Sequence, residues 1–202
     1  DGFLRDYIDM PPERLVRVPA NVDPKVASFS ELVSVAVHAV DRFEKFSHSR
    51  KNSIGIWGDG SLAYVVANVI KARFPQSKIA VIGMDKRKLS QFSFADETYL
   101  STEIPKDFEV DHAFECCGGE GSYYAIEDVI NYINPQGTLM LMGVSENKVA
   151  INTRMVLEKG ITLVGCSRSG REDFEKAVSL MEQPDFSRRM KVIIFEDKPV
   201  RD

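Results

Sequence analysis

The chain has 202 residues, of which 44% are hydrophobic, and a formal net charge of −4. Its length suits one large domain, or one domain with an appendage, and its apolar content excludes a chain that is disordered throughout. The negative charge argues against general binding to nucleic acids or acidic membranes, and no run of eighteen apolar residues is present to span a bilayer. No basic-then-apolar leader is visible, and because the first residue is Asp1 rather than Met, we expect part of a longer protein.

The first fifty residues predict extended pieces followed by one long helix. Apolar and polar residues alternate in "LVRVP" (15–19), which predicts a half-buried strand, and the prolines around it exclude a long helix. From 28 to 46 the apolar residues recur at helical spacing, and Ser28 or Ser30 is the expected cap at the start of this helix.

From residue 53 onward, apolar strands alternate with amphipathic helices. The expected strands are 53–57, 78–83, 96–100, 111–116, 137–143, 161–166 and 191–196, and the expected helices are 61–73, 86–92, 121–133, 152–159 and 171–183. This alternation predicts an α/β protein with a parallel sheet and helices on both faces, the doubly wound architecture known as the Rossmann fold.

The turn after the first of these strands, "GDGSLA" (58–63), matches the pattern G-x-G-x-x-[GA]. A strand precedes it and a helix follows, which is the context that a dinucleotide-binding turn requires. Gly58 permits the tight turn, Gly60 lets a pyrophosphate approach the backbone, and Ala63 is small enough for the helix to pack on the strand. A glycine turn that binds nothing is the alternative.

The helix that starts at Ser61 and Leu62 offers free N–H groups and a partial positive charge to the same anion. We therefore assign both residues to the cofactor site. Asp59 is a middle residue of the pattern, is expected to point away from the anion, and receives no role.

The residue at the end of the second strand decides between NAD and NADP, because NAD-selective members carry an acid there that accepts from the ribose 2′-OH. Here the strand ends at Gly83, which we expect to leave room for a 2′-phosphate beside Met84. The basic run "KRK", which includes Lys86 and Arg87, can supply counter-charge. This favours NADP, and the preference reverses if Asp85 reaches the ribose; an exposed helix start is the alternative for the basic run.

Ligands of open α/β sheets lie at the carboxyl ends of the strands. Cys116 follows one strand and is expected near the nicotinamide, while Gly143, Val144 and Ser145 follow the next strand at the same edge. Arg168, after the strand at 161–166, is a candidate contact for a phosphate of cofactor or substrate, and an ordinary surface arginine is the alternative.

The cysteines Cys116, Cys117 and Cys166 lack the spacing of a zinc site, and adjacent cysteines would make a strained disulfide. Reduced thiols in a cytoplasmic protein are the plain interpretation. A small buried apolar side chain is a sufficient role for Cys116 and for Cys117.

Several longer segments, "DHAFECCGG" (111–119), "INPQGTLMLMGVSE" (133–146) and "LEKGITLVGCSRSG" (157–170), resemble the zinc-dependent medium-chain alcohol dehydrogenases. Within that superfamily, "SFSELVSVAVHAVDRFEK" (28–45) and "GIWGDGSLAYVVANVI" (55–70) are most similar to the bacterial ribulose-5-phosphate reductases. The similarity extends over essentially the whole chain.

The resemblance implies a GroES-like catalytic domain that precedes the cofactor domain. Residues 1–22 are then the tail of the catalytic domain, and residues 23–202 are an NADP-binding Rossmann domain. The implied activity is NADPH-dependent reduction of ribulose 5-phosphate to ribitol 5-phosphate, for CDP-ribitol and teichoic-acid or capsule synthesis. No catalytic residue is identifiable in the chain itself, so the chain alone is expected to turn over no substrate.

Zinc is the second cofactor that the resemblance implies, with most of its ligands outside this chain. Glu31 is the one candidate ligand, and a helix-start acid favoured by the helix dipole is the alternative. The resemblance also implies a homodimer joined through the edge strand at 161–166 and, from the pathway alone, a cytidylyltransferase partner. Two other hypotheses stay open: another zinc-dependent polyol or sugar dehydrogenase, and a dinucleotide-binding module without catalysis.

Overall fold

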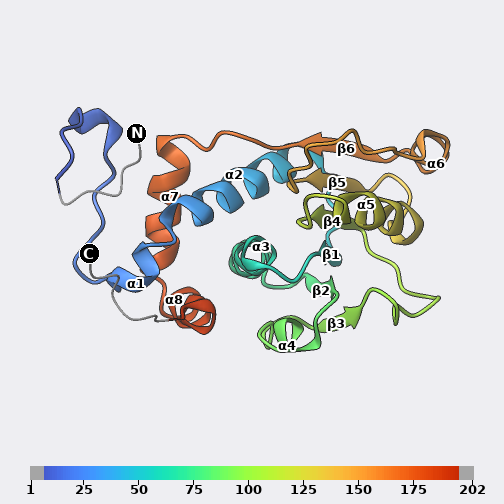
Figure 1. Cartoon of the computed structure of the whole chain (residues 1–202), viewed down its shortest axis with the longest axis horizontal. Coiled ribbons are helices and arrows are strands. Elements are labelled where there is room, and N and C mark those ends of the chain that lie inside the picture. The colour runs from blue at the N-terminus through green and yellow to red at the C-terminus, as the bar shows by residue number, and fades with distance from the viewer. Residues whose placement is uncertain (1–6, 196–202) are drawn as a thin grey trace.

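Six parallel strands form the centre of the structure, a computed structural model that describes residues 7–195 (Figure 1). The strands are β1 (Ser53–Trp57), β2 (Lys78–Gly83), β3 (Glu97–Leu100), β4 (His112–Glu115), β5 (Thr138–Leu141) and β6 (Thr162–Gly165). Their order across the sheet is β3-β2-β1-β4-β5-β6, and every neighbouring pair is parallel. The predicted doubly wound sheet is therefore confirmed, with its switch point, where such sheets bind ligands, between β1 and β4.

Helices cover both faces of this sheet. They are α1 (Pro24–Ala27), α2 (Ser30–Phe46), α3 (Ser61–Arg73), α4 (Lys86–Leu89), α5 (Gly121–Tyr132), α6 (Thr153–Lys159), α7 (Arg171–Met181) and α8 (Pro184–Met190). Figure 1 places α2 and α3 on one side of the sheet and α5 and α6 on the other, while α7 contacts α2 and α8 contacts α3. Within residues 7–195, no helix is long and apolar enough to cross a membrane.

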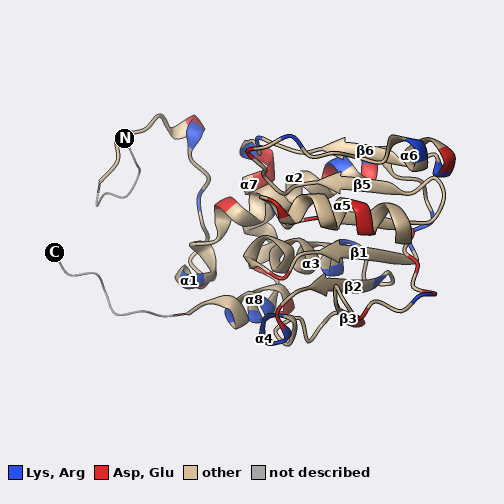
Figure 2. Cartoon of the chain, turned by 45° about the vertical axis from the view of Figure 1, so that its right-hand side comes forward, with Lys and Arg blue, Asp and Glu red and all other residues tan. Residues whose placement is uncertain are grey.

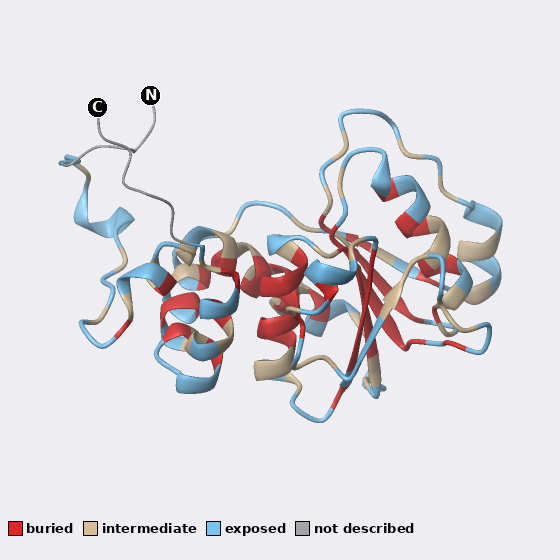
Figure 3. Cartoon of the chain, turned by 60° about the horizontal axis from the view of Figure 1, so that its bottom comes forward, coloured by how far each residue is buried: buried red, intermediate tan, exposed pale blue. Residues whose placement is uncertain are grey.

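Alternate residues of the central strands contribute to two separate cores. Ile54 and Ile56 of β1 pack in the core beneath α2 and α3, whereas Trp57 packs in the core beneath α5. In β2, Val81 belongs to the first core and Ile82 to the second. A strand buried on both faces requires this period of two, and the central strands are buried along their length (Figure 3).

The segment before α1 does not contain the strand predicted at 15–19. The regular element there is a 3-10 turn over Pro12–Arg14, and residues 15–19 pair with no strand among those described. Leu15 is 51% exposed and Val18 is 42% exposed. Alternation of apolar and polar residues produces a stable strand only where another strand and a covering layer are present, and the described residues supply neither.

The predicted serine cap of the long helix is wrong. The helix expected over 28–46 begins at Ser30, and its N-cap is Phe29, which makes no side-chain cap bond. The hydroxyl of Ser28 donates to the carbonyl of Lys25 at 2.7 Å, and that of Ser30 donates to the carbonyl of Ala27 at 2.5 Å. Because α1 ends directly before α2, both hydroxyls bond to carbonyls at the end of α1 instead of capping α2.

The strand predicted at 191–196 is wrong as well. Within the described residues this stretch is a 3-10 turn over Lys191–Ile193 that continues α8, and Glu196 lies outside the described residues. A short apolar run such as "VII" fits a strand or a buried helical turn equally well. The helical choice follows from the packing of α8, which the sequence prediction missed.

Helix α8 packs against α3 through buried apolar residues and two hydrogen bonds. Phe186 and Met190 are completely buried at helical spacing. The hydroxyl of Tyr64 donates to the carbonyl of Arg189 at 2.8 Å, and the side-chain amide of Asn68 donates to the carbonyl of Phe186 at 3.3 Å. Both donors lie on α3, so the C-terminal part of the chain supports the helix that follows the glycine turn.

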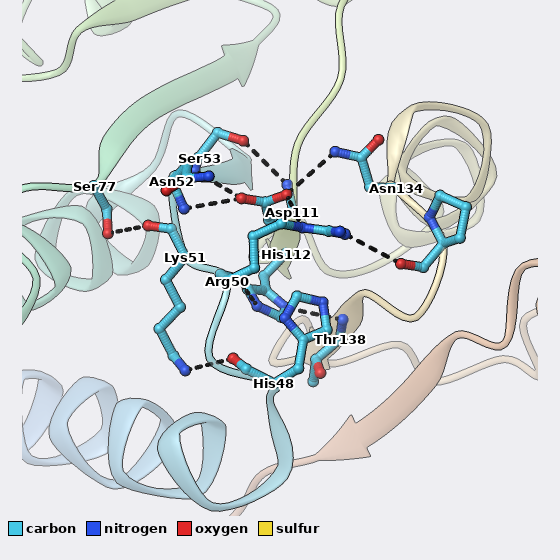
Figure 4. A network of polar contacts seen from close by, with 11 residues as sticks. His48, Arg50, Lys51, Asn52, Ser53, Ser77, Asp111, His112, Asn134 and Thr138 are labelled. Carbon is cyan, nitrogen blue, oxygen red and sulfur yellow. Dashed lines mark hydrogen bonds and ion pairs between the residues drawn. The ribbon is translucent and has the colours of Figure 1, made fainter.

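At the amino ends of the strands, Asp111 joins three segments of the chain (Figure 4). Its carboxylate accepts from the backbone N–H of Asn52 at 2.8 Å, from the Arg50 guanidinium at 2.7 Å and from the Asn134 amide at 3.3 Å. Burial raises the pKa of Asp111, but these hydrogen bonds outweigh it and hold that pKa below its ordinary value.

His112 lies completely buried beside this network (Figure 4). The Thr138 N–H donates to its Nδ1 at 3.0 Å, and its Nε2 lies 2.8 Å from the carbonyl of Arg50, so these partners fix the neutral tautomer with the proton on Nε2. Burial, assisted by the nearby His48, lowers the pKa of His112 to about 4. Protonation would therefore place a charge in the core and break the bond from Thr138.

We expect His112 to make the protein less stable in mild acid. Its folded pKa lies below the ordinary value of 6.5, so between pH 6.5 and 4 the unfolded chain binds a proton that the folded chain rejects. The free energy of unfolding should fall by about 2 kcal/mol between pH 7 and pH 5 from this group alone. Urea unfolding at both pH values measures this fall. The variant His112→Asn keeps an acceptor and cannot be protonated, so its unfolding free energy should fall by about 2 kcal/mol less between pH 7 and pH 5. An equal pH dependence in the variant would contradict the assignment.

Candidate functional site at the carboxyl edge of the sheet

The glycine turn (residues 58–63) connects β1 to α3 at the edge where the strands end. Gly58 has φ of +135°, and a Cβ there would lie 3.0 Å from the carbonyl oxygen of Cys116. Its N–H donates to the carbonyl of Ile82 at 2.8 Å, which ties the turn to β2. Both the positive φ and the close backbone of the neighbouring strand therefore require glycine at this position.

Gly60 and the first turn of α3 present an open surface to a ligand. A Cβ at Gly60 would meet nothing within 4 Å, and Gly60 is the N-cap of α3 without any side-chain cap bond. Ser61 is exposed and Leu62 half-buried, whereas Ala63 is completely buried. A helix start with uncapped N–H groups and no side chain in front of it fits the pyrophosphate of a dinucleotide.

A cavity of about 780 Å³ adjoins the glycine turn. Five of the residues predicted to bind cofactor line it: Gly58, Gly60, Gly83, Met84 and Cys116. Its other wall is one face of α5, with Gly121, Tyr124, Ala125 and Asp128. Met84 is 85% exposed and Tyr124 is 69% exposed, so a flat ring has apolar side chains available at the mouth of this cavity.

The other predicted cofactor residues lie outside the cavity. Lys86 and Arg87 are exposed on α4, which Figure 2 shows as a basic segment. Val144 is 84% exposed in the loop after β5, between Gly143 and Ser145. Arg168 is exposed in the loop after β6 with φ of 65°, a conformation that few residues other than glycine adopt.

Glu115 holds the loops after β4 and β5 together, and the sequence prediction missed it. It is the last residue of β4 and is 1% exposed. One carboxylate oxygen accepts from the N–H of Cys117 at 2.9 Å, the N–H of Gly118 at 3.2 Å and the Ser122 hydroxyl at 3.0 Å. The other accepts from the N–H of Gly143 at 3.0 Å. A buried acid at a strand end followed by a glycine pair is the sequence signal that was available.

Position 143 has no room for a side chain because the Glu115 carboxylate lies next to it. A Cβ at Gly143 would lie 2.7 Å from Oε2 of Glu115 and 2.5 Å from the N–H nitrogen of Gly118. The two loops also bond directly, because the Gly119 N–H donates to the carbonyl of Val144 at 2.8 Å. The geometry thus explains the glycine by its packing on Glu115, while its contact with a cofactor stays a prediction.

Asp59 packs against Gly83 and points toward the loop after β2, while room for a 2′-phosphate beside Gly83 stays a prediction. A Cβ at Gly83 would lie 2.7 Å from Cβ and 2.9 Å from Oδ2 of Asp59. The Asp59 carboxylate accepts from the N–H of Met84 at 2.8 Å and from that of Asp85 at 2.9 Å. A side chain at position 83 would therefore clash with Asp59 of the glycine turn.

Asp85 is engaged with its own helix. Its carboxylate accepts from the backbone N–H groups of Arg87 at 2.8 Å and Lys88 at 3.4 Å, and these bonds lower the pKa of Asp85 below its ordinary value. Both bonds go to Oδ1, which is the arrangement of a helix N-cap. That Asp85 does not reach the ribose stays a prediction.

The thiols at this edge differ in exposure. Cys116 is buried, and burial raises the pKa of its thiol well above the ordinary value. Cys117 is exposed, so its expected role as a small buried apolar residue is wrong. A buried thiol with a raised pKa is a poor nucleophile, which leaves Cys116 as a packing residue of the cavity wall.

Glu31 is exposed in the first turn of α2. Within residues 7–195, no three or more histidine, cysteine, aspartate or glutamate side chains are grouped so that they could hold a metal ion. These residues by themselves do not form a zinc site.

Known proteins with similar sequences define the family. Residues 93–183 match the family model described as zinc-binding dehydrogenase. The chain is 50% identical to a ribulose-5-phosphate reductase of Streptococcus pneumoniae and 46% identical to one of Bacillus spizizenii, in each case over 100% of this chain. The chain is therefore similar to the zinc-binding dehydrogenases over residues 93–183 and to the ribulose-5-phosphate reductases over its whole length. It spans 58% and 59% of the length of these two curated relatives.

Solved structures of similar proteins share this fold. The crystal structure of S. aureus TarJ in complex with NADPH superimposes with a TM-score of 0.91 at 47% identity, covering 96% of this chain and 61% of that one.

Glu115→Gln should lower the free energy of unfolding by about 2 kcal/mol, because an amide NH₂ would face backbone N–H donors that now share a carboxylate. Urea unfolding measures the change. The matched control is Glu120→Gln in the same loop, where the exposed side chain makes no cap bond to α5 and the change should stay within about 0.5 kcal/mol. Equal stability of the two variants would contradict the role of Glu115.

Proposed function

We propose that this chain is the NADPH-binding part of an enzyme that reduces ribulose 5-phosphate to ribitol 5-phosphate. The observation that carries the proposal is the open, uncapped helix start at the glycine turn beside a cavity of about 780 Å³. The names of the relatives at 46–50% identity and the NADPH complex of TarJ support the substrate and the cofactor. In this proposal, residues 1–22 are the tail of a catalytic domain and residues 23–202 are the cofactor domain.

In this proposal, different residues of the chain bind different parts of the cofactor. The N–H groups at Gly60, Ser61 and Leu62 hold the pyrophosphate, with Ala63 keeping α3 close to β1. The adenosine end enters the cavity between Met84 and Tyr124, near the positive charges of α4. Bound NADPH supplies the hydride that reduces the carbonyl group.

The nicotinamide end extends along the carboxyl edge toward the later strands. It passes Cys116 and the loop of Gly143, Val144 and Ser145, which Glu115 holds in place. Arg168 lies farther along the same edge and is positioned for a phosphate of the sugar substrate. Glu31 is the proposed contribution of this chain to a zinc site whose other ligands lie outside it.

Gly60→Val should abolish NADPH binding, because the valine methyl groups would fill the open space through which the pyrophosphate reaches the helix start. Titration of the chain with NADPH, followed by nucleotide fluorescence or calorimetry, measures the affinity. Gly165→Val is the matched control: a Cβ there also meets nothing within 4 Å, but the residue lies in β6, away from the turn. Equal NADPH affinity in Gly60→Val and the unaltered chain would refute the proposed site.

We also propose a homodimer in which the β6 strands of two copies pair. β6 is the edge of the sheet in the described part of the chain, and its residues Thr162 and Gly165 are exposed. An uncovered strand edge favours pairing with a second strand. The cytidylyltransferase partner stays an implication of the resemblance.

Light scattering tests the dimer. The measured mass should be about twice the 22.7 kDa of the chain, because edge pairing extends the sheet by one copy. A mass of one chain at every concentration would contradict pairing through β6. The NADPH titration is independent of this result, since the glycine turn lies at the opposite side of the switch point from β6.

A further inference from the structure

The geometry points to Asp59 as the residue that limits how strongly the chain prefers NADPH over NADH. This inference rests on the proposed function, since it concerns the 2′-phosphate end of the same site. The glycine-turn pattern itself requires no acid at position 59, and the family fingerprint reads selectivity from the end of β2 instead.

Asp59 makes a specific set of contacts with the loop after β2. Its Oδ2 accepts from the N–H groups of Met84 at 2.8 Å and Asp85 at 2.9 Å, and its Oδ1 lies 3.7 Å from Nζ of Lys88. The side chain is only 15% exposed. Two backbone donors and one ammonium therefore already surround a negative charge at the point where β2 ends.

This carboxylate stands where an NAD-selective protein has its acid. A side chain at Gly83 would begin 2.7 Å from Cβ of Asp59 and 2.9 Å from its Oδ2. The end of β2 thus carries no acid at position 83, and Asp59 of the glycine turn places a carboxylate beside that position. For a ribose 2′-OH this carboxylate is a hydrogen-bond acceptor, whereas for a 2′-phosphate it is a like charge that occupies two donors.

The charges around the position act in opposite directions. Lys86, Arg87 and Lys88 of α4 attract a 2′-phosphate, and the carboxylate of Asp85 is already bonded to N–H groups of that helix (Figure 2). The carboxylates of Asp59 and Asp85 both repel the phosphate, and that of Asp59 also occupies the N–H groups of Met84 and Asp85 at the end of β2. NADPH therefore binds by taking the N–H groups of Met84 and Asp85 from the Asp59 carboxylate, and this exchange reduces its advantage over NADH.

Asp59→Asn tests the inference, because the amide oxygen still accepts the backbone N–H groups while the charge is removed. The dissociation constants of NADPH and NADH are measured by calorimetry at low salt. The ratio of the NADH constant to the NADPH constant should rise at least about threefold in the variant, and the rise should shrink in high salt. Asp59→Ala, which frees both donors, should change the ratio in the same direction and serves if the asparagine variant does not fold.

Asp96→Asn is the matched control. Asp96 also accepts a backbone N–H of β2, that of Ile79 at 2.8 Å, and also lies near a lysine, Lys71 at 3.4 Å, but at the other end of the strand. In this variant, the ratio of the NADH to the NADPH dissociation constant should equal that of the unaltered chain. A ratio in the Asp59 variants that is unchanged or lower, or a weakening of both nucleotides alike, would overturn the inference. An unaltered chain that binds neither nucleotide would instead refute the proposed function.

Discussion

The carboxyl edge of this sheet depends on one buried carboxylate. Glu115 accepts hydrogen bonds from the loops after β4 and β5 and from the first turn of α5, so three segments take their positions from one side chain. Hydrogen bonds to a carboxylate are stronger than bonds between neutral groups, and leaving such an acid buried without them would be costly. The glycines at 118 and 143 follow from this arrangement, since larger residues would not fit around the carboxylate and the backbone bonded to it.

Aspartates repeat this use of a carboxylate at other strand ends. Asp111 and Asp96 accept backbone N–H groups at the amino ends of the strands, and Asp59 does so at the carboxyl end of β2. Short parallel strands leave many N–H groups without a ladder partner where the chain turns, and each needs an acceptor. The acids supply those acceptors, and at the carboxyl edge they also determine which charges a bound nucleotide meets.

Much of the architecture was predictable because it depends on local patterns. The periods of two and 3.6 gave the six strands and the helices between them, and the glycine turn gave the start of α3 at Ser61. The strand predictions at 15–19 and 191–196 were wrong for one reason. The secondary structure of a short apolar run depends on the elements that pack against it. Leu15 has no cover among the described residues, whereas Ile193 is covered where α8 packs on α3.

The site was predictable in its backbone and much less so in its side chains. Glycines indicate turns because of their conformational freedom, so Gly58 and Gly60 could be predicted from their spacing alone. Glu115 and Asp59 act through contacts with residues that are near only after folding. Asp59 reaches Met84, 25 residues away, and Glu115 reaches Gly143, 28 residues away. No local pattern encodes such pairs, so these contacts could not be predicted from the spacing of residues.

The bond between Tyr64 and Arg189 joins residues 125 positions apart. Tyr64 lies on the first turns of α3, whose start is the open end of the glycine turn. During synthesis on the ribosome, this helix emerges long before the segment that covers its outer side. The helix that starts at the nucleotide site can therefore receive this support only after α8 has left the exit tunnel and packed against α3.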